Sequence, residues 1–277
     1  MTDQVTVADL TFDVLIDGPE DGPAVVLLHG FPETSATWTH VLPDLVAAGH
    51  RVVAPNQRGY SPGARPTDID AYGVDVLVAD VLGIVDALKI DRFHLVGHDW
   101  GAAVAWALAA WHRERLLSLT ALSVPHLAAY NHAIRHDPDA RERASYIALL
   151  RQEGRAEDLL LEDGAARLRA MYGDAVPPEQ VDTYLAQLQD REALTAALAW
   201  YRAMTPSLAD LPAVDVPTTY LWSDQDLAIG QAGADACHEH VTADFEYVVL
   251  EGITHWIPEQ APDAVVEAVL GRIRRAG

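Results

Sequence analysis

An aspartate flanked by glycines is the first residue in this chain with the setting of a nucleophile. It lies at the centre of Gly97-His98-Asp99-Trp100-Gly101, after an apolar run and before a segment of small residues. This pattern predicts a sharp turn from a strand into a helix, and a serine more commonly occupies the centre of such a turn. A carboxylate in that position can be alkylated and then released by hydrolysis of the resulting ester. The alternative is that Asp99 only caps the helix.

A histidine and an acid that follow later strands are candidates to assist Asp99. His255 lies between the last predicted strand and the last predicted helix, and hydrolases with such a turn carry nucleophile, acid and histidine in this chain order. The histidine can take a proton from water while the acid fixes its orientation. We expect the acid to be Asp226, with Asp224 as a competitor, although either could be a turn residue. Ser123, after the preceding strand, supplies no carboxylate.

The loop within LLHGFPET, residues 27–34, is a candidate oxyanion hole. A glycine-containing loop after a buried strand, beside the nucleophile turn, can present backbone N–H groups to a developing negative charge. The expected donors are the amides of Phe31 and Trp100, whose side chains are also expected to contact the substrate. The alternative is an ordinary connection between a strand and a helix.

The elements that must position these residues alternate between strand and helix. Short apolar runs end at glycine or polar residues, as fully buried strands do, and a helical stripe of apolar residues covers 74–88. This alternation predicts an α/β fold, with a mostly parallel β-sheet flanked by helices on both faces. The predicted strands cover residues 10–17, 23–30, 50–56, 92–97, 116–124, 217–223 and 245–252, and the predicted flanking helices cover 37–48, 74–88, 101–111 and 262–275.

The alternation stops between residues 125 and 205. Only helical segments are predicted there, so the α/β core is expected to comprise residues 1–124 and 206–277, with 125–205 as an inserted helical lid. Such an insertion between strands would cover the carboxyl edge of the sheet. The helices expected within it are 140–152, 157–172, 178–189 and 191–203.

Composition excludes several classes of partner. The net charge of −22 disfavours binding to nucleic acid or to an anionic membrane surface. Cys237 is the only cysteine, so neither an intrachain disulfide nor a cysteine-based metal site is possible. The start of the chain lacks the features of a signal peptide, and no apolar run is long enough to span a bilayer. We therefore expect a cytoplasmic protein that acts on a small molecule; its oligomeric state stays open.

No metal or organic cofactor is expected. The sequence HEH at 238–240 has the wrong spacing for two histidines on one face of a helix, and we expect no other histidine pair on a helix face.

The chain resembles the α/β-hydrolase superfamily and, within it, the epoxide hydrolases. The resemblance covers nearly the whole length and rests on four motifs in the family's order: HGFPE (29–33), QRGYSPGARP (57–66), GHDWGA (97–102) and THW (254–256). An aspartate in the nucleophile turn is shared with haloalkane and haloacetate dehalogenases. The resemblance therefore implies the ester-forming mechanism more strongly than it implies the substrate.

The lid motifs favour an epoxide over a halogenated substrate. Epoxide hydrolases of this family use two lid tyrosines that hold and protonate the epoxide oxygen, and the segments SYIALLRQEGRAE and AWYRAM match these at Tyr146 and Tyr201. Haloalkane dehalogenases need an indole beside the nucleophile, as in Trp100, and an asparagine where this chain has Phe31. Haloacetate dehalogenases commonly carry an arginine at the position of Trp100. The resemblance thus implies epoxide hydrolysis, with dehalogenation as the alternative.

Overall fold

The fold is an eight-stranded sheet with helices on both faces. The computed structural model describes residues 2–276, without the side chain of Ser207. The strands occur in the order β1-β2-β4-β3-β5-β6-β7-β8; β1 pairs antiparallel with β2 and β2 with β4, and all other neighbours are parallel. This confirms the predicted fold class. The strands are β1 (Thr2–Val7), β2 (Leu10–Asp17), β3 (Ala24–Leu28), β4 (Arg51–Pro55), β5 (Phe93–His98), β6 (Leu116–Leu122), β7 (Thr218–Ser223) and β8 (Phe245–Leu250).

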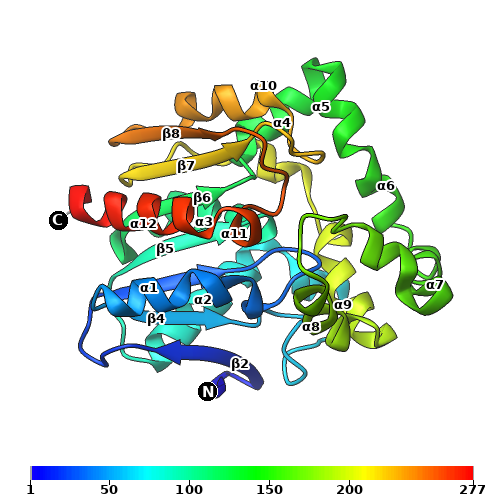
Figure 1. Ribbon diagram of the computed structural model, residues 1–277, viewed down its shortest axis with the longest axis horizontal. Helices are drawn as coiled ribbons and strands as arrows, with labels where there is room; N and C mark the ends of the chain where they lie inside the picture. Colours follow the sequence, from blue (N-terminus) through cyan, green and yellow to red (C-terminus); the bar gives the residue numbers. More distant parts are fainter. Residues whose placement is uncertain (1, 277) are drawn as a thin grey trace.

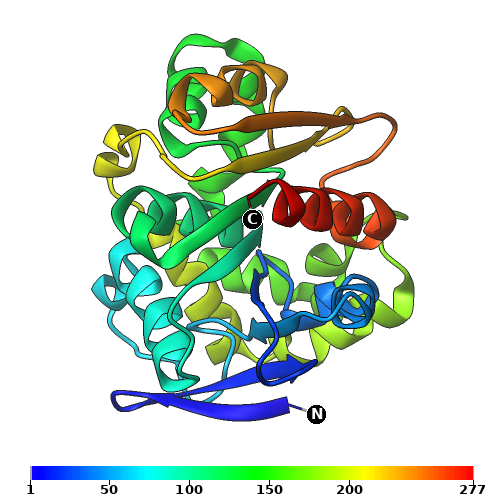
Figure 2. The ribbon, with the colours of Figure 1, turned by 90° about the vertical axis from the view of Figure 1, so that its left-hand side faces the viewer.

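Two helical layers cover the sheet, one on each face (Figure 2). Helices α2 (Val74–Ala87) and α3 (Trp100–Trp111) pack against each other on one face, and α3 contacts β5 and β6. Helices α1 (Leu42–Ala47) and α12 (Pro262–Ala276) pack on the other face, where α12 contacts β6 and β7. The central strands are therefore buried on both sides, which explains why β3 and β5 are buried at every residue.

A group of helices extends over one end of the sheet, at the right of Figure 1. These helices lie between β6 and β7, and no strand forms between residues 125 and 205, all of which the structure describes. The group consists of α4 (Leu127–His136), α5 (Pro138–Arg143), α6 (Ile147–Leu150), α7 (Arg155–Ala170), α8 (Pro178–Leu188) and α9 (Arg191–Arg202). The short helices of the chain complete the list: α10 (Gln231–Asp235), α11 (Ile257–Gln260), and the 3-10 turns η1 (Ser35–His40), η2 (Ile69–Tyr72), η3 (Arg113–Arg115), η4 (Ala144–Tyr146), η5 (Pro206–Asp210) and η6 (Ala236–His240).

Among the elements that differ from the sequence-based expectations are β1, α4 and α7. Strand β1 was not predicted, because only Val5 of its six residues is buried and an edge strand of this kind has no apolar alternation. Helix α4 was also not predicted. The helix expected at 157–172 begins at Arg155 and is broken at 162–165, where Asp163, Gly164 and Ala165 have positive φ.

None of the helices that the structure describes combines the length and the apolar character of a membrane span.

Candidate active site

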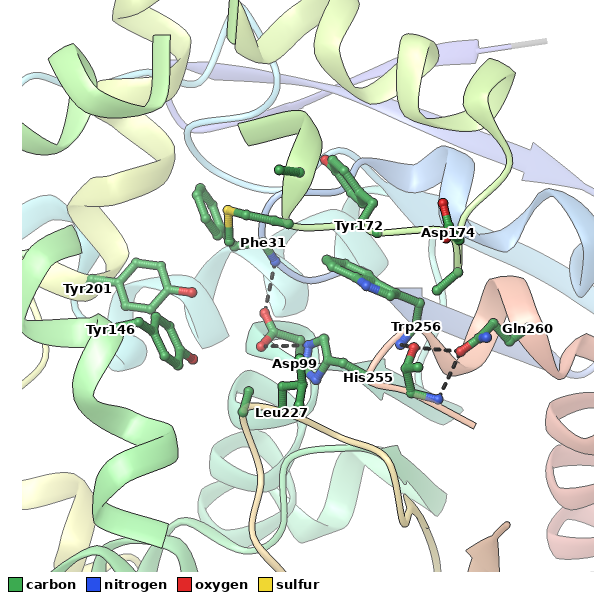
Figure 3. Close-up of a pocket in the computed structure, with 16 residues that line it drawn as sticks. Phe31, Asp99, Tyr146, Tyr172, Asp174, Tyr201, Leu227, His255, Trp256 and Gln260 are labelled. Carbon is green, nitrogen blue, oxygen red and sulfur yellow. Dashed lines mark hydrogen bonds and ion pairs between the residues drawn. The ribbon is translucent and has the colours of Figure 1, made fainter. Parts of the chain in front are cut away.

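Loops at the carboxyl ends of five strands bring the predicted site residues together. Phe31 follows β3, Asp99 follows β5, Ser123 follows β6, Asp226 follows β7 and His255 follows β8. Parallel strands end at the same edge of the sheet, and this edge is the usual location of a binding site in an open α/β sheet. The loops converge beneath the helices α4–α9 (Figures 1 and 3).

Asp99 is held in an unusual backbone conformation between strand and helix. Its φ of 51° and ψ of −119° lie outside the regions that most residues adopt, and α3 begins directly after it. A side chain on Gly97 would collide with the carbonyl group of Gly101, and one on Gly101 would collide with the carbonyl group of Leu28. The two glycines therefore permit the close approach of β5, α3 and β3 that produces the turn.

The Asp99 carboxylate contacts two groups. On one side lies the loop after β3 that contains Phe31, called here the oxyanion loop, and on the other side lies His255. The backbone N–H of Phe31 donates a hydrogen bond of 2.9 Å to Asp99 Oδ1. Asp99 Oδ2 lies 3.5 Å from His255 Nε2. Asp99 does not cap α3 through its side chain, although it occupies the N-cap position. Trp100 follows as the first residue of α3, where a helix N–H has no carbonyl partner within the helix.

Asp226 is the acid that contacts the histidine. Its side chain is completely buried, and its Oδ2 lies 2.9 Å from His255 Nδ1. The backbone N–H groups of Ala228 and Ile229 donate hydrogen bonds to Oδ1, at 2.7 and 3.0 Å. The Ser123 hydroxyl donates a further hydrogen bond of 2.9 Å to Oδ2. Every oxygen of this buried carboxylate is therefore satisfied, and the carboxylate is fixed in one orientation.

Asp224 lies outside the site. Its side chain is exposed, and its Oδ1 accepts a hydrogen bond of 2.7 Å from the backbone N–H of Gly252. This contact ties the loop after β7 to the turn after β8. The geometry thus separates the two aspartates that the sequence left as alternatives.

The charges of the three groups depend on one another. Burial alone would lower the pKa of His255, but the Asp226 carboxylate, followed by Asp99, raises it well above its ordinary value. For Asp226, burial alone would raise the pKa, but His255 and the two backbone N–H donors lower it. In the resting site, a protonated His255 accordingly lies between two carboxylates.

Tyr146 and Tyr201 lie side by side across the pocket from Asp99, as Figure 3 shows. Tyr201 comes from α9 and is 3% exposed, whereas Tyr146 ends η4 and is partly buried. Their ring centroids are 6.3 Å apart, and Tyr201 also contacts the rings of Phe31 and Trp100 edge-on. Burial raises the pKa of both phenols well above the ordinary value, with added contributions from neighbouring groups that include Asp99. Both hydroxyls therefore remain protonated and available as donors.

Two buried residues behind the site were not assigned a role from the sequence. Glu33 Oε2 accepts a hydrogen bond of 3.1 Å from Gly30 N–H and lies 3.0 Å from His98 Nδ1. The second ring nitrogen of His98, Nε2, lies 2.8 Å from the backbone carbonyl oxygen of His255. Glu33 and His98 thus link the oxyanion loop to the loop of the histidine. Both lie within motifs that the sequence analysis quoted, HGFPE and GHDWGA, and this was the only signal for them.

One histidine pair contradicts an expectation. His132 and His136 have the spacing H-x-x-x-H on α4, and their rings stack with centroids 4.2 Å apart. The expectation that no histidines share a helix face was therefore wrong. Among the described residues, however, no group of three or more histidine, cysteine, aspartate or glutamate side chains is arranged to hold a metal ion.

Comparisons with known proteins identify the family. The sequence profile of the α/β hydrolase fold matches residues 23–262. The AB hydrolase superfamily protein YfhM of Bacillus subtilis is 34% identical over 273 residues, which cover 96% of this chain and 95% of that protein. Epoxide hydrolase A of Mycobacterium tuberculosis is 30% identical, and the match covers 91% of each chain.

Solved structures agree with these sequence matches. A structure described among novel epoxide hydrolases from metagenomes of hot environments superimposes with a TM-score of 0.88 at 30% identity, covering 99% of this chain and 98% of the other. Epoxide hydrolase A from Mycobacterium thermoresistibile gives a TM-score of 0.87 at 28% identity, with the same coverage. The chain therefore belongs to the α/β-hydrolase fold family and, within it, to the epoxide hydrolases.

Proposed function

We propose that this enzyme opens epoxides to vicinal diols through a covalent ester on Asp99. The observation that carries the proposal is the arrangement of one carboxylate opposite two protonated phenols, with His255 behind the carboxylate. An epoxide needs both a nucleophile at carbon and an acid at oxygen, because an alkoxide is a poor leaving group. The family membership supports the same reaction.

In the first step, Asp99 Oδ2 attacks one ring carbon and the bond from that carbon to the epoxide oxygen breaks. Oδ1 is held by the Phe31 amide, so Oδ2 is the oxygen free to react. Tyr146 and Tyr201 donate hydrogen bonds to the opening oxygen, and one of them transfers its proton. The products of the step are an ester on Asp99, a neighbouring hydroxyl group on the substrate and a phenolate on that tyrosine, which regains its proton through solvent when His255 releases one.

In the second step, His255 takes a proton from a water molecule, which attacks the Asp99 carboxyl carbon. Alkylation removes the negative charge of Asp99, and this charge contributes to the raised pKa of His255. Ester formation therefore lowers the pKa of His255 and favours its release of a proton, which makes it available as a base. The amides of Phe31 and Trp100 stabilise the tetrahedral intermediate, with each donor contributing roughly 3 kcal/mol. The bond between the carboxyl carbon and the former Asp99 Oδ2 then breaks, so that this oxygen leaves in the diol, which receives a proton from His255.

The helices between β6 and β7 have the function of a lid in this proposal. Residues 125–205 supply both phenols, whereas the core segments 1–124 and 206–277 supply Asp99, Asp226 and His255. A lid that carries the acid completes the site only when it lies over the sheet.

The test is a panel of neutral epoxides and haloalkanes, assayed separately for diol and for halide. Diol release from epoxides with no halide from haloalkanes is the expected result. Trp100 could provide one indole donor to a halide, but Phe31 stands where a second side-chain donor would be needed. Halide release without diol formation would overturn the proposal and favour dehalogenation by the same three residues.

A further inference from the structure

Two cavities of very different size meet at the reacting groups. The larger has a volume of about 540 Å³ and the smaller about 50 Å³. Asp99, Tyr146 and Tyr201 line both of them. A substrate whose ring lies between Asp99 and the two phenols therefore adjoins both cavities.

The larger cavity opens to solvent. At its rim lie Leu227, which is 82% exposed, and the exposed residues Gly173 and Asp174. Aromatic side chains, among them Tyr172 and Trp256, form much of its wall. No lysine or arginine is among the described residues that line either cavity. This cavity accommodates a large, uncharged, apolar group, such as an aryl ring.

The smaller cavity is bounded by packed side chains of the lid and the core. Leu127 of α4 and Met204, which follows α9, close it from the lid, and Val124 and Ile229 close it from the loops after β6 and β7. Of these residues, Leu127 is 5% exposed and Ile229 is 2% exposed. An apolar cavity that admits benzene measures about 150 Å³, which is three times this volume. A methyl group is similar in size to a water molecule, which needs only about 10–15 Å³, and it fits.

We propose that the preferred substrates are neutral epoxides with a bulky apolar group on one ring carbon and only hydrogen or methyl on the other. This inference rests on the proposed function and names its substrate class. The bulky group occupies the open cavity of about 540 Å³, and the small end of the epoxide enters the cavity of about 50 Å³. The walls around Leu127 and Met204 set the limit on the second substituent.

A series of three epoxides that differ only at the second carbon tests the inference. Styrene oxide carries hydrogen there, trans-β-methylstyrene oxide carries methyl and trans-stilbene oxide carries phenyl. The trans geometry directs the two substituents to opposite sides of the ring. We expect the first two to have kcat/KM values within about tenfold of each other, and trans-stilbene oxide to fall at least about 100-fold below styrene oxide. Equal kcat/KM for trans-stilbene oxide and styrene oxide would overturn the inference.

Variants that enlarge the smaller cavity supply an independent readout. Leu127→Ala and Met204→Ala are each expected to raise the ratio of kcat/KM for trans-stilbene oxide to that for styrene oxide by about tenfold. Met204 is only partly buried, so its truncation perturbs folding less than that of Leu127. The matched control is Leu160→Ala, a buried leucine of α7 that lines neither cavity, which should leave the ratio unchanged.

The outcomes separate the two proposals. An unchanged ratio in both cavity variants would overturn the inference while the proposed function stands. Absence of diol from all three epoxides would instead overturn the proposed function, together with the substrate class that rests on it.

Discussion

Asp99 combines a strained backbone with a carboxylate whose two oxygens have different partners. Oδ1 lies against the Phe31 amide and Oδ2 faces His255; in the proposed mechanism, the first oxygen is the one stabilised by the amide and the second is the one that attacks. A side chain on Gly30 would collide with the Asp99 side chain, so the oxyanion loop can approach only at a glycine. The two carboxylate oxygens of Asp99 therefore differ in their surroundings, which the sequence alone does not show.

The two lid phenols give the first prediction. Tyr201→Phe should slow epoxide opening more than about tenfold, and the double variant with Tyr146→Phe should nearly abolish it, because both phenols proposed to protonate the leaving oxygen are then absent. The measurement is the single-turnover rate of ester formation on an epoxide. Wild-type rates in the double variant would show that the tyrosines do not act on the epoxide oxygen.

The orientation of His255 gives the second prediction. Asp226→Ala should allow ester formation but stall ester hydrolysis, because His255 loses the partner that holds Nδ1. Pre-steady-state kinetics should therefore show a burst of epoxide consumption followed by little turnover. Asp224→Ala is the matched control and should keep steady-state rates close to wild type. A stall in the Asp224 variant, with normal turnover in the Asp226 variant, would reverse the assignment.

The residues of the candidate site differ in how far the local sequence identifies them. The spacing around Asp99 and the loop position of His255 were sufficient to single out both. Local sequence was not sufficient to decide between Asp226 and Asp224. Two carboxylates two positions apart in a loop differ only in the direction in which the loop points each side chain. The hydrogen bond of Ser123 to Asp226 joins residues 103 positions apart, and no local pattern predicts such a contact.

At the scale of elements, a buried carboxyl group joins the lid to the core. Glu259 of α11 accepts hydrogen bonds from the Thr37 hydroxyl of η1, at 2.8 Å, and from the Tyr184 hydroxyl of α8, at 2.6 Å. Burial, followed by the nearby charge of Glu33, raises the pKa of Glu259 from 4.5 to about 7, while His98 acts in the opposite direction. At neutral pH, the Glu259 carboxyl group, which joins α8 to the core, is therefore close to its pKa.

This contact gives the third prediction. Between pH 4.5 and 7, the folded protein keeps a proton on Glu259 that the unfolded chain has released, so stability is lost as pH rises through this window. Glu259→Gln cannot ionise, and it should raise the free energy of unfolding at pH 8 by roughly 1–3 kcal/mol more than at pH 5. Denaturant unfolding at the two pH values measures the difference. Glu251→Gln, at an exposed glutamate, is the control. An equal effect of Glu259→Gln at both pH values would contradict the prediction.

The elements of the core were more predictable than those of the lid. The buried parallel strand β3 is a continuous apolar run, and the periodicity of α2 is that of a helix covering a sheet. The lid helices pack on one another and on loops, so their apolar faces vary. The break at 162–165 in α7 illustrates this, because the turn dipeptide Asp163-Gly164 lies inside a segment expected to be one helix, and Ala165 adopts a positive φ that is uncommon for alanine.

Considered as a whole, the molecule separates its chemistry into two parts that lie far apart in the sequence. In the proposed mechanism, the core supplies the nucleophile, base and acid, whereas the insertion supplies the phenols and part of the walls of the small cavity. The net charge of the chain is −22. Among the described residues, no lysine or arginine lines either cavity. We therefore expect the enzyme to favour uncharged substrates over anionic ones.

The covalent ester on Asp99 is the central claim, and isotope incorporation in a single turnover tests it most directly. With enzyme in excess over an epoxide in oxygen-18 water, water attacks the Asp99 carboxyl carbon, so the label should enter the peptide that contains Asp99. The diol should be mostly unlabelled, because its new oxygen comes from the original carboxylate. Mass spectrometry of the diol and of the peptide measures both. Label in the diol on the first turnover, with Asp99 unlabelled, would mean direct attack by water and would contradict the account.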